Sequence, residues 1–470
     1  MNTIKFIAII TTMFSVGSSL VKAEVGIAPE TGCASDLKQP SAVQILEKRI
    51  RVFNQTDFGS GLQARAENGS LVLLRSGVVT VDQSVSSPHF GKSRDFAYAK
   101  ALSNLQAKFI LKKDSELQVQ ITTEEYSAEP SGDDLKFEDE DNSENAYVRI
   151  GDKVFKLAEA KLDNALRQEG VSEEEVQSAP REKKIDLFRE SIKRKSSRKA
   201  FGKASGLIPV KTIEAVDCDG RAGVSVIAVY SEKNEEFVNA VLNGDSMKPD
   251  KNRAAKQTLQ IQVDSEIDNG SIVSEWGIRK LYDTAGYPIL VSYGQWGYVP
   301  RQGMVKANER RRRGALNQAD AGAVEQLTLF LNSQATFLDE TSREQFVNSY
   351  IKVTETDNGV VKTEGEVTEY LEKSSETFSA NGNVKLTGLS DPIHWDLPYP
   401  HQRAQSNIVG SVLYWSPRNE DAINTAAGKM AQRENSAKPV IDSEGSVDDT
   451  QAIEASKVSE SKVKNNVDDF

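Results

Sequence analysis

Apolar residues recur every three or four positions in several stretches of the chain, and this spacing predicts amphipathic helices. A short helix is expected at 41–53, and longer helices at 93–111 and 304–331. Alanines line one face of each longer helix, which favours close packing on a sheet. The packing residues expected there are Phe96, Ala97, Ala101, Leu105, Phe109 and Ile110 in the first helix and Ala315, Ala319, Ala323, Leu327 and Leu331 in the second.

Runs of β-branched and aromatic residues predict buried strands. Segments 70–81 and 287–299 each contain two apolar runs separated by a glycine, Gly77 in one and Gly294 in the other, which predicts two β-hairpins. Aromatic residues gather around the second predicted hairpin: Trp276, Tyr287, Tyr293, Trp296 and Tyr298. Core packing explains most of them, and any that are exposed would mark a binding edge.

One stretch occurs twice, first as 224–244 and again, altered, as 409–428. The shared kernel is an aromatic residue, Ser, any residue, a basic residue, Asn, Glu and an acid. A buried strand is expected before each Ser. Ser231 and Ser416 are each expected to cap a short helix, which ends at Gly244 in the first copy and at Gly428 in the second. A hairpin and an Ala-rich helix precede both copies, so the order of elements predicts two related units.

The first unit is about thirty residues longer than the second, which indicates an insert. Residues 129–146 form an acidic loop, and 152–203 predict two charged helices that are split near 178–180. One apolar stripe on each helix predicts a helical hairpin that packs on the domain or on a partner. The stripes consist of Leu157, Leu162 and Leu166 in one helix and Ile185, Phe188 and Ile192 in the other.

These patterns predict an α+β protein of two related units. The expected organisation is a signal peptide at 1–23, an extended lead-in at 24–40, a first unit at 41–262 that includes the insert, a second unit at 263–432, and a disordered polar tail at 433–470.

The first residues predict export across a bacterial inner membrane. Lys5 opens a basic start, 6–21 is an apolar run, and Val21-Lys22-Ala23 offers a cleavage site after Ala23. The alternative is a transmembrane anchor, but the run is shorter than about 20 unbroken apolar residues. Lipid anchoring would need a Cys directly after the cleavage site, whereas the first Cys is Cys33.

Composition describes a polar globular chain of 470 residues with 38% hydrophobic and 27% charged residues. The net charge of −11 becomes −13 when the two lysines of the signal peptide are removed. A surface this acidic repels phosphate backbones, so nucleic acid is not an expected partner.

Cys33 and Cys218 are the two cysteines of the chain. In an oxidising compartment they are expected to form a disulfide, which closes a long loop and could contribute up to about 5 kcal/mol. Two buried free thiols are the alternative.

One catalytic alternative rests on Gly244-Asp-Ser-Met247 together with Asp391-Pro-Ile-His394. These two motifs are typical of the GDS-type esterases and acylhydrolases. In that interpretation Ser246 would attack the substrate, His394 would take the proton of Ser246 and Asp391 would orient the imidazole. Three observations oppose this interpretation. Gly244 falls at an expected helix end, the two motifs lie in different units, and no parallel α/β alternation is present. The expectation is therefore a protein without catalytic residues.

No motif predicts a cofactor or a metal ion. Asp139, Asp141 and Ser143 match the start of a calcium loop, but Glu144 and Ile150 occupy positions that need Gly and Glu. Basic runs at 193–199 and 310–313 are interpreted as solvated helix faces. Contact with an acidic partner or a cell-wall polymer is the alternative.

The Ala-rich helix, with Ala97, Lys100, Ala101 and Leu105, and the strand with Val224, Val226, Ala228 and Val229 resemble repeat domains of bacterial envelope proteins. The flagellar H-ring protein FlgT and small outer-membrane lipoproteins of similar fold are the nearest examples. The resemblance covers about half of the chain. This sequence differs from those proteins because it lacks a lipidation Cys and carries the charged insert. It implies a structural or interaction role in the envelope, within a family of secreted bacterial proteins.

Together these features predict an exported, non-enzymatic interaction or assembly protein of the bacterial envelope, in the periplasm or at the cell surface. Its expected partners are envelope proteins, and it is not expected to span a membrane. The residues expected to bind them lie in the charged insert and along the aromatic edge.

Overall fold

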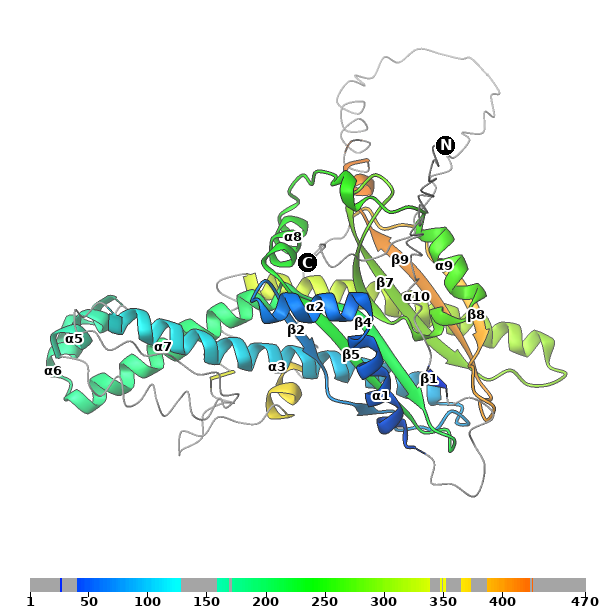
Figure 1. Ribbon diagram of the computed structural model, residues 1–470, viewed down its shortest axis with the longest axis horizontal. Coiled ribbons are helices and arrows are strands. Elements are labelled where there is room, and N and C mark those ends of the chain that lie inside the picture. Colours follow the sequence, from blue (N-terminus) through cyan, green and yellow to red (C-terminus); the bar gives the residue numbers. More distant parts are fainter. Residues whose placement is uncertain are drawn as a thin grey trace, which may run out of the picture.

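The computed structural model describes residues 26–27, 40–127, 159–168, 171–338, 347–348, 350–351, 365–372, 387–422 and 425. The helices are α1 (Ala42–Asn54), α2 (Asp57–Glu67), α3 (Phe90–Ser127), α5 (Glu159–Gln168), α6 (Glu173–Ser178), α7 (Arg181–Ala204), α8 (Glu232–Asn243), α9 (Leu259–Asp268) and α10 (Val305–Leu338), with 3-10 turns η2 (Lys251–Arg253) and η3 (Ser271–Ser274). The strands are β1 (Gly26–Ile27), β2 (Val72–Arg75), β3 (Val79–Thr80), β4 (Leu207–Val216), β5 (Ala222–Tyr230), β6 (Gly277–Tyr282), β7 (Pro288–Tyr298), β8 (Ile393–Pro398) and β9 (Asn407–Trp415). The fold is α+β, as the sequence predicts, and is built around two sheets (Figure 1).

In the first sheet the strand order is β1-β4-β5-β2, and β3 also pairs with β5. The predicted hairpin at 70–81 is wrong. Strands β2 and β3 both run antiparallel to β5, with Arg75 opposite Ile227 and Val79 opposite Val224. They are two parts of one edge strand, interrupted by a bulge that contains Gly77.

In the second sheet the order is β6-β7-β9-β8, and every pair is antiparallel. The hairpin predicted at 287–299 is also wrong, because β7 continues through Gly294 without a turn. Gly294 is needed for helix packing instead of a turn. A Cβ atom there would lie 2.2 Å from the carbonyl oxygen of Ala319 and 2.8 Å from the Cβ of Ala323, so the glycine allows α10 to approach the strand.

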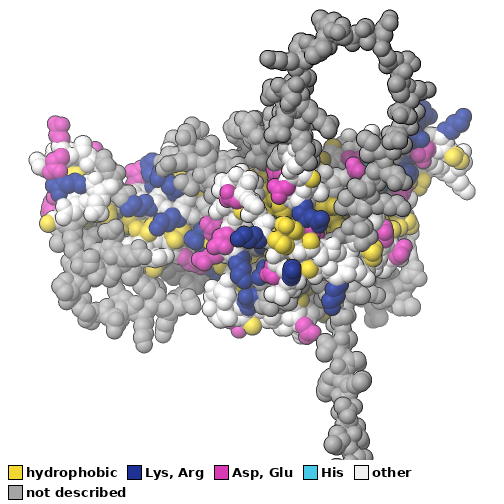
Figure 2. All heavy atoms as spheres, turned by 90° about the horizontal axis from the view of Figure 1, so that it is seen from above, with side chains coloured by type: hydrophobic (Ala, Val, Ile, Leu, Met, Phe, Trp, Pro, Cys, Tyr) yellow, Lys and Arg dark blue, Asp and Glu magenta, His cyan; other side chains and the backbone are white. Residues whose placement is uncertain are grey.

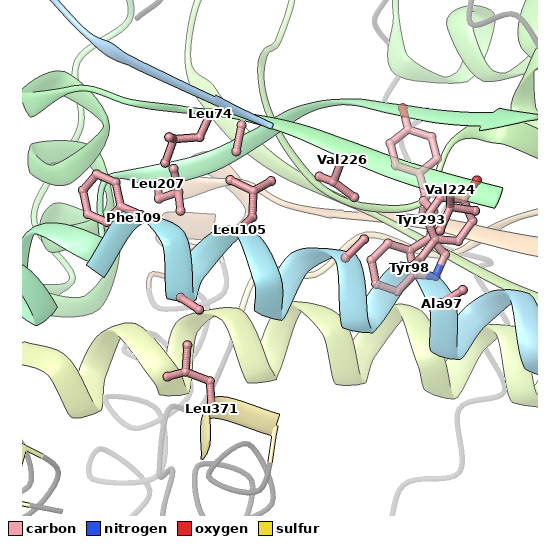
Figure 3. Close-up of a cluster of buried hydrophobic side chains, with 14 of the residues drawn as sticks. Leu74, Ala97, Tyr98, Leu105, Phe109, Leu207, Val224, Val226, Tyr293 and Leu371 are labelled. Carbon is pink, nitrogen blue, oxygen red and sulfur yellow. The ribbon is translucent and has the colours of Figure 1, made fainter. Parts of the chain in front are cut away.

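Helices cover both faces of the first sheet. Helices α1 and α2 pack on one face, where Leu46, Ile50 and Leu62 meet Ile227 and Val229 of β5. Helix α3 packs on the other face, where its apolar side chains meet the even-numbered residues of β5 (Figure 3). The predicted α10 stripe is buried throughout, on the second sheet.

One residue of the predicted α3 stripe is misplaced. Phe96 is 63% exposed, and its ring lies under the ammonium group of Lys92. The buried face contains Arg94, Ala97 and Tyr98 instead. Phe96 lies two positions after Arg94, about 200° around the helix, and so points away from that face.

The predicted insert forms a helical arm that extends from the sheets (Figure 1). The arm comprises α5, α6, α7 and the part of α3 that they contact. The predicted break near 178–180 separates α6 from α7. The segment before it, predicted as one helix, contains two, α5 and α6, because Ser172 caps a new helix that begins at Glu173. The arm has its own apolar core of Ile121, Leu162, Leu166, Val176, Ile185, Phe188 and Ile192. All the predicted stripe residues are in it except Leu157, which lies outside the described residues.

The basic run 193–199 is only partly a solvated face, so that expectation is wrong in part. Lys193, Ser196 and Ser197 are buried. Ser196 and Ser197 donate hydrogen bonds to Asp114 of α3, whose carboxylate is also buried. These contacts use polar residues of the run to join α7 to α3.

The same order of elements along the chain builds each sheet: a strand, then a long helix, then an antiparallel pair of strands. The elements are β2/β3, α3, β4 and β5 for the first sheet and β7, α10, β8 and β9 for the second. Strand β6 has no counterpart in the first sheet, and the predicted duplication stays a prediction. Ser231 is the N-cap of α8 and accepts a hydrogen bond from Asn234 N, and α8 ends at Gly244 with a positive φ, as expected.

Several predictions concern residues that the structure does not describe. These are the signal peptide, Cys33, the acidic loop 129–146 with its calcium-like segment, and the tail 433–470. Within the described residues, no helix combines the length and the apolar character that crossing a membrane requires.

Candidate functional site

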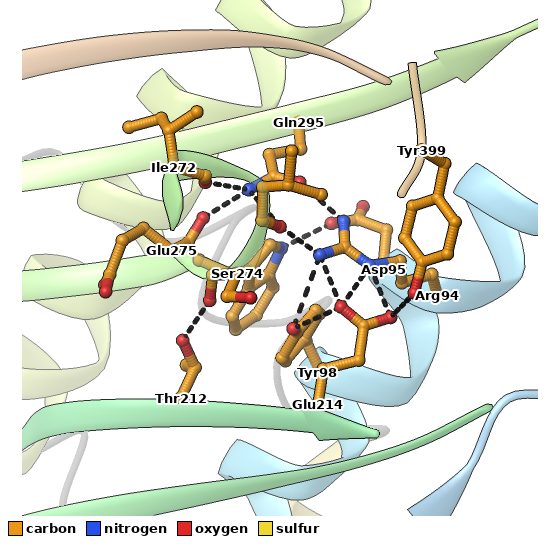
Figure 4. A network of polar contacts seen from close by, with 12 residues as sticks. Arg94, Asp95, Tyr98, Thr212, Glu214, Ile272, Ser274, Glu275, Gln295 and Tyr399 are labelled. Atoms are coloured by element: carbon orange, nitrogen blue, oxygen red, sulfur yellow. Dashed lines mark hydrogen bonds and ion pairs between the residues drawn. The ribbon is translucent and has the colours of Figure 1, made fainter. Parts of the chain in front are cut away.

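A linker, residues 271–276, leads from α9 into β6 and is bound by side chains of both sheets, beside the place where β4 adjoins β6. Side chains from several elements bind its backbone carbonyl groups. Gln295 of β7 donates to the carbonyls of Ile272, Val273 and Glu275, and Thr212 of β4 donates to that of Ser274. We call this linker and the polar side chains around it the junction (Figure 4).

Arg94 of α3 lies at the centre of the junction and is 2% exposed. Its Nε and Nη2 atoms lie 2.7–2.9 Å from the carboxylate oxygens of Glu214, which is 0% exposed. Nη1 donates to Gln295 Oε1, and Nη2 also donates to the carbonyl of Val273. The guanidinium therefore joins α3, β4, β7 and the linker in one network.

Two tyrosines also donate hydrogen bonds to Glu214. Tyr399 donates to Oε1 at 2.9 Å and Tyr98 donates to Oε2 at 3.2 Å. Burial, followed by the nearby Glu214 charge, raises the pKa of both phenols well above the ordinary value. Burial alone would lower the pKa of Arg94, but Glu214 raises it above the ordinary value. Both tyrosines stay protonated donors, and Arg94 stays charged.

Trp276 ends the linker and stacks on Tyr98, with ring centroids 5.1 Å apart and an interplanar angle of 11°. Its indole N–H donates to Asp95 of α3. Burial raises the pKa of Asp95 to about 6, against the lowering effects of Trp276 and Arg94. The junction thus contains a carboxyl group that titrates in the mildly acidic range.

The polar groups of the junction are directed at one another. Arg94 has at least one acceptor at each of its three nitrogens, and both oxygens of Glu214 accept from several donors. Such a network fixes the relative position of its elements. The network holds the two sheets and the base of the arm in one arrangement, because α3 continues from the junction into the arm.

Ser246 and His394 of the proposed catalytic triad have different neighbours in the structure. Ser246 is exposed after the end of α8 and lines a small pocket together with Trp415 and Glu420. The Nε2 atom of His394 in β8 lies 2.7 Å from Asp320 of α10, so His394 is oriented by Asp320 rather than by Asp391. The esterase alternative stays untested, and this geometry does not favour it.

The predicted aromatic edge is mostly packed. Trp276 and Tyr293 are buried, while Tyr287, Trp296 and Tyr298 are partly buried. Tyr298 donates a hydrogen bond to Asp396, and both lie near the start of α10. Core packing therefore explains Trp276 and Tyr293, as expected, and within the described residues none of the five is fully exposed to form a binding edge.

The basic run 310–313 lies in the first turns of α10 and is balanced by acids, as expected. Arg312 pairs with Asp396 at 2.8 Å, and Arg313 pairs with Glu309 at 3.1 Å.

Cys218 follows β4 and is not a free thiol. Its predicted partner Cys33 lies outside the described residues, so the disulfide stays a prediction. The parallel pairing of β1 with Ala215 and Val216 brings the chain six residues before Cys33 to the end of β4 that leads to Cys218.

The sequence patterns do not predict the junction. A charged residue beside or within an apolar pattern was the available signal: Arg94 lies beside the Ala-rich stripe of α3, and Glu214 lies in 207–216, where the remaining residues are apolar except Lys211 and Thr212. Charged residues are almost never fully buried unless they are paired. The sequence alone does not indicate that these two belong together.

One domain model from comparison with known proteins matches part of this chain. A family model described as a domain of unknown function, DUF6844, matches residues 147–243. This segment contains α5–α7 of the arm together with β4, β5 and α8. No curated protein matches the chain.

Among solved structures, the 2.3 Å crystal structure of the hypothetical protein FTT1539c from Francisella tularensis is similar to this chain. The TM-score is 0.50 at 18% sequence identity, and the match covers 84% of this chain and 95% of that chain. At this identity the likeness concerns the fold alone. It extends over most of both chains, so the two-sheet architecture is not peculiar to this sequence.

Proposed function

We propose that this protein is an exported interaction or assembly component of a bacterial envelope, and that the arm contacts its partner. The observation that carries the proposal is the arm itself, which extends away from the two sheets on α5, α6 and the outer parts of α3 and α7 (Figure 1). The inner ends of α3 and α7 belong to the core beside the sheets, whereas the outer part of the arm has its own core and presents surface away from the sheets.

The arm is held in shape by its own contacts. Its apolar core is supplemented by ion pairs between its helices, such as Lys184 with Asp163 at 2.7 Å and Lys183 with Glu175 at 3.2 Å. Since α3 is also fixed at the junction, the orientation of the arm relative to the sheets is set before any partner binds. A preorganised surface loses less conformational entropy on binding.

The surface of the arm carries both signs of charge. Basic and acidic side chains alternate along the visible face, and few apolar ones are grouped there (Figure 2). Exposed residues include Glu174, Glu182 and Asp186. This pattern favours a polar, specific contact with another folded protein over burial in a lipid phase.

Export rests on the start of the sequence, and the position of β1 is consistent with it. Cleavage after Ala23 would leave Gly26 and Ile27 in the mature chain, where they pair with β4. A disulfide between Cys33 and Cys218 would then fasten this segment to the first sheet in an oxidising compartment.

Site-specific photo-crosslinking in cells tests the role of the arm. A photoreactive residue at Glu174 or Glu182 is expected to give one defined adduct. The same residue at the control positions Glu232 and Asp264, exposed acids on the body, should not. Adducts that are equally frequent at all four positions, or absent from the arm, would refute the assignment.

Export is tested separately by fractionation and by N-terminal sequencing of the purified protein. A mature chain that begins at Glu24 and a periplasmic or extracellular location are expected. An intact N-terminus on protein recovered in the cytoplasm would overturn export while leaving the role of the arm open to the crosslinking result.

A further inference from the structure

A second carboxyl group, Glu266 of α9, lies where that helix meets the junction. Its Oε1 atom accepts a hydrogen bond from Gln262 at 2.8 Å. Its Oε2 atom is buried and has no hydrogen-bond partner among the described residues. A buried carboxylate oxygen without a donor destabilises the charged form of the group.

Charged groups from each neighbouring element surround Glu266. Glu275 of the linker is the acidic neighbour, while Lys211 of β4 and Arg279 of β6 are basic. Arg279 donates to Glu275 at 3.1 Å, to Thr212 and to the carbonyls of Trp276 and Ile278.

Two further strands adjoin Glu266. Tyr293 of β7 is buried near it and stays a neutral phenol, since burial and the charge of Glu266 raise its pKa well above the ordinary value. Strand β8 also contacts α9, but its titratable side chains, His394 and Asp396, bind Asp320 and Arg312 of α10 instead.

We propose that protonation of Glu266 controls how firmly α9 is held against the linker, so that the junction opens more readily as pH rises through neutrality. When Glu266 is neutral, the like-charge repulsion with Glu275 is absent and the buried oxygen needs no counter-charge. When it ionises, both effects oppose the closed arrangement.

The direction and size follow from linkage. Burial, and then the neighbouring Glu275, raises the pKa of Glu266 from 4.5 to about 7 in the folded protein. If opening exposes Glu266 to water and restores its ordinary pKa, the open form binds fewer protons than the closed form between these values. Opening is then favoured by roughly 25-fold at about pH 8 relative to about pH 5.5.

Hydrogen–deuterium exchange with mass spectrometry measures this opening. The amides of Val273 and Glu275, which donate to Gly270 and Ile272, report on the linker. After correction for the intrinsic pH dependence of exchange, their opening constant in the full chain is expected to rise roughly 25-fold between the two pH values.

Three variants make the test specific. Glu266→Gln should remove the part of the pH dependence that comes from Glu266 and leave only a smaller contribution from Asp95, and Glu275→Gln should reduce the dependence by removing the repulsion. Asp264→Asn removes an exposed acid from the same helix and should leave the dependence unchanged. An unchanged pH dependence in Glu266→Gln would overturn the proposal, as would a flat profile in the wild type.

If Glu266→Gln does not fold stably, Glu275→Gln decides the question, because it leaves Glu266 in place. A smaller rise in linker opening than in the wild type would support the proposal, and an equal rise would refute it.

Discussion

Replacing Arg94 by Met is expected to lower the free energy of unfolding by about 3–5 kcal/mol, the usual effect of breaking a buried ion pair by removing one partner. Met is similar in length but has no donors. Glu214, which is 0% exposed, would then lose its charge partner. Gln295 Oε1 and the carbonyl of Val273 would each lose a donor as well. Tyr98 and Tyr399 would still donate to Glu214, so the carboxylate would not lose every contact.

Urea denaturation followed by tryptophan fluorescence measures the change, because Trp276 stacks on Tyr98 beside Arg94. The double variant Arg94→Met/Glu214→Gln should recover part of the loss, since it removes the unpaired charge. Arg313→Met is a matched control at a side chain that is 74% exposed and paired with Glu309, where a change of less than about 1 kcal/mol is expected.

A loss below about 1 kcal/mol for Arg94→Met, comparable with an exposed ion pair, would refute the assignment of the junction as the structural link between the sheets. The assignment would also be refuted if the two substitutions were additive, so that the double variant loses the sum of the unfolding free energies lost by Arg94→Met and Glu214→Gln alone. Additivity would mean that the two side chains do not interact.

Other predictions address separate features. Gly294→Ala should cost about 1–3 kcal/mol or more in thermal or urea unfolding, because its Cβ would overlap the Ala319 carbonyl, whereas Gly314→Ala, in an open position on α10, should be neutral or stabilising. The raised pKa of Asp95 means that stability falls as pH rises from about 4 through about 6, by up to about 3 kcal/mol. Asp95→Asn should remove this part of a pH–stability profile. Ser231→Ala should cost about 1 kcal/mol by removing the α8 N-cap.

Local patterns in the sequence predicted the elements that depend on local periodicity. The α10 stripe of Ala315, Ala319 and Ala323 is buried as expected, because residues spaced by three or four share one face of any helix. The arm helices and the break near 178–180 were predictable for the same reason, together with the Pro at the start of α7.

The hairpins were wrongly predicted because a glycine between two apolar runs has more than one structural use. At Gly77 it lies in a bulge of an edge strand, and at Gly294 it makes room for α10. Which use applies depends on the element that packs against it. That element, β5 for the first and α10 for the second, is distant in the sequence or on the opposite face.

Neighbouring residues were therefore enough to predict the α+β class, the amphipathic helices, the cap at Ser231 and the charged arm. The pairing of the strands, and the buried ion pair between Arg94 and Glu214, 120 positions apart, depend on how the whole chain folds. Burial makes a charge costly, and its partner is selected by three-dimensional proximity, a property that no local spacing encodes.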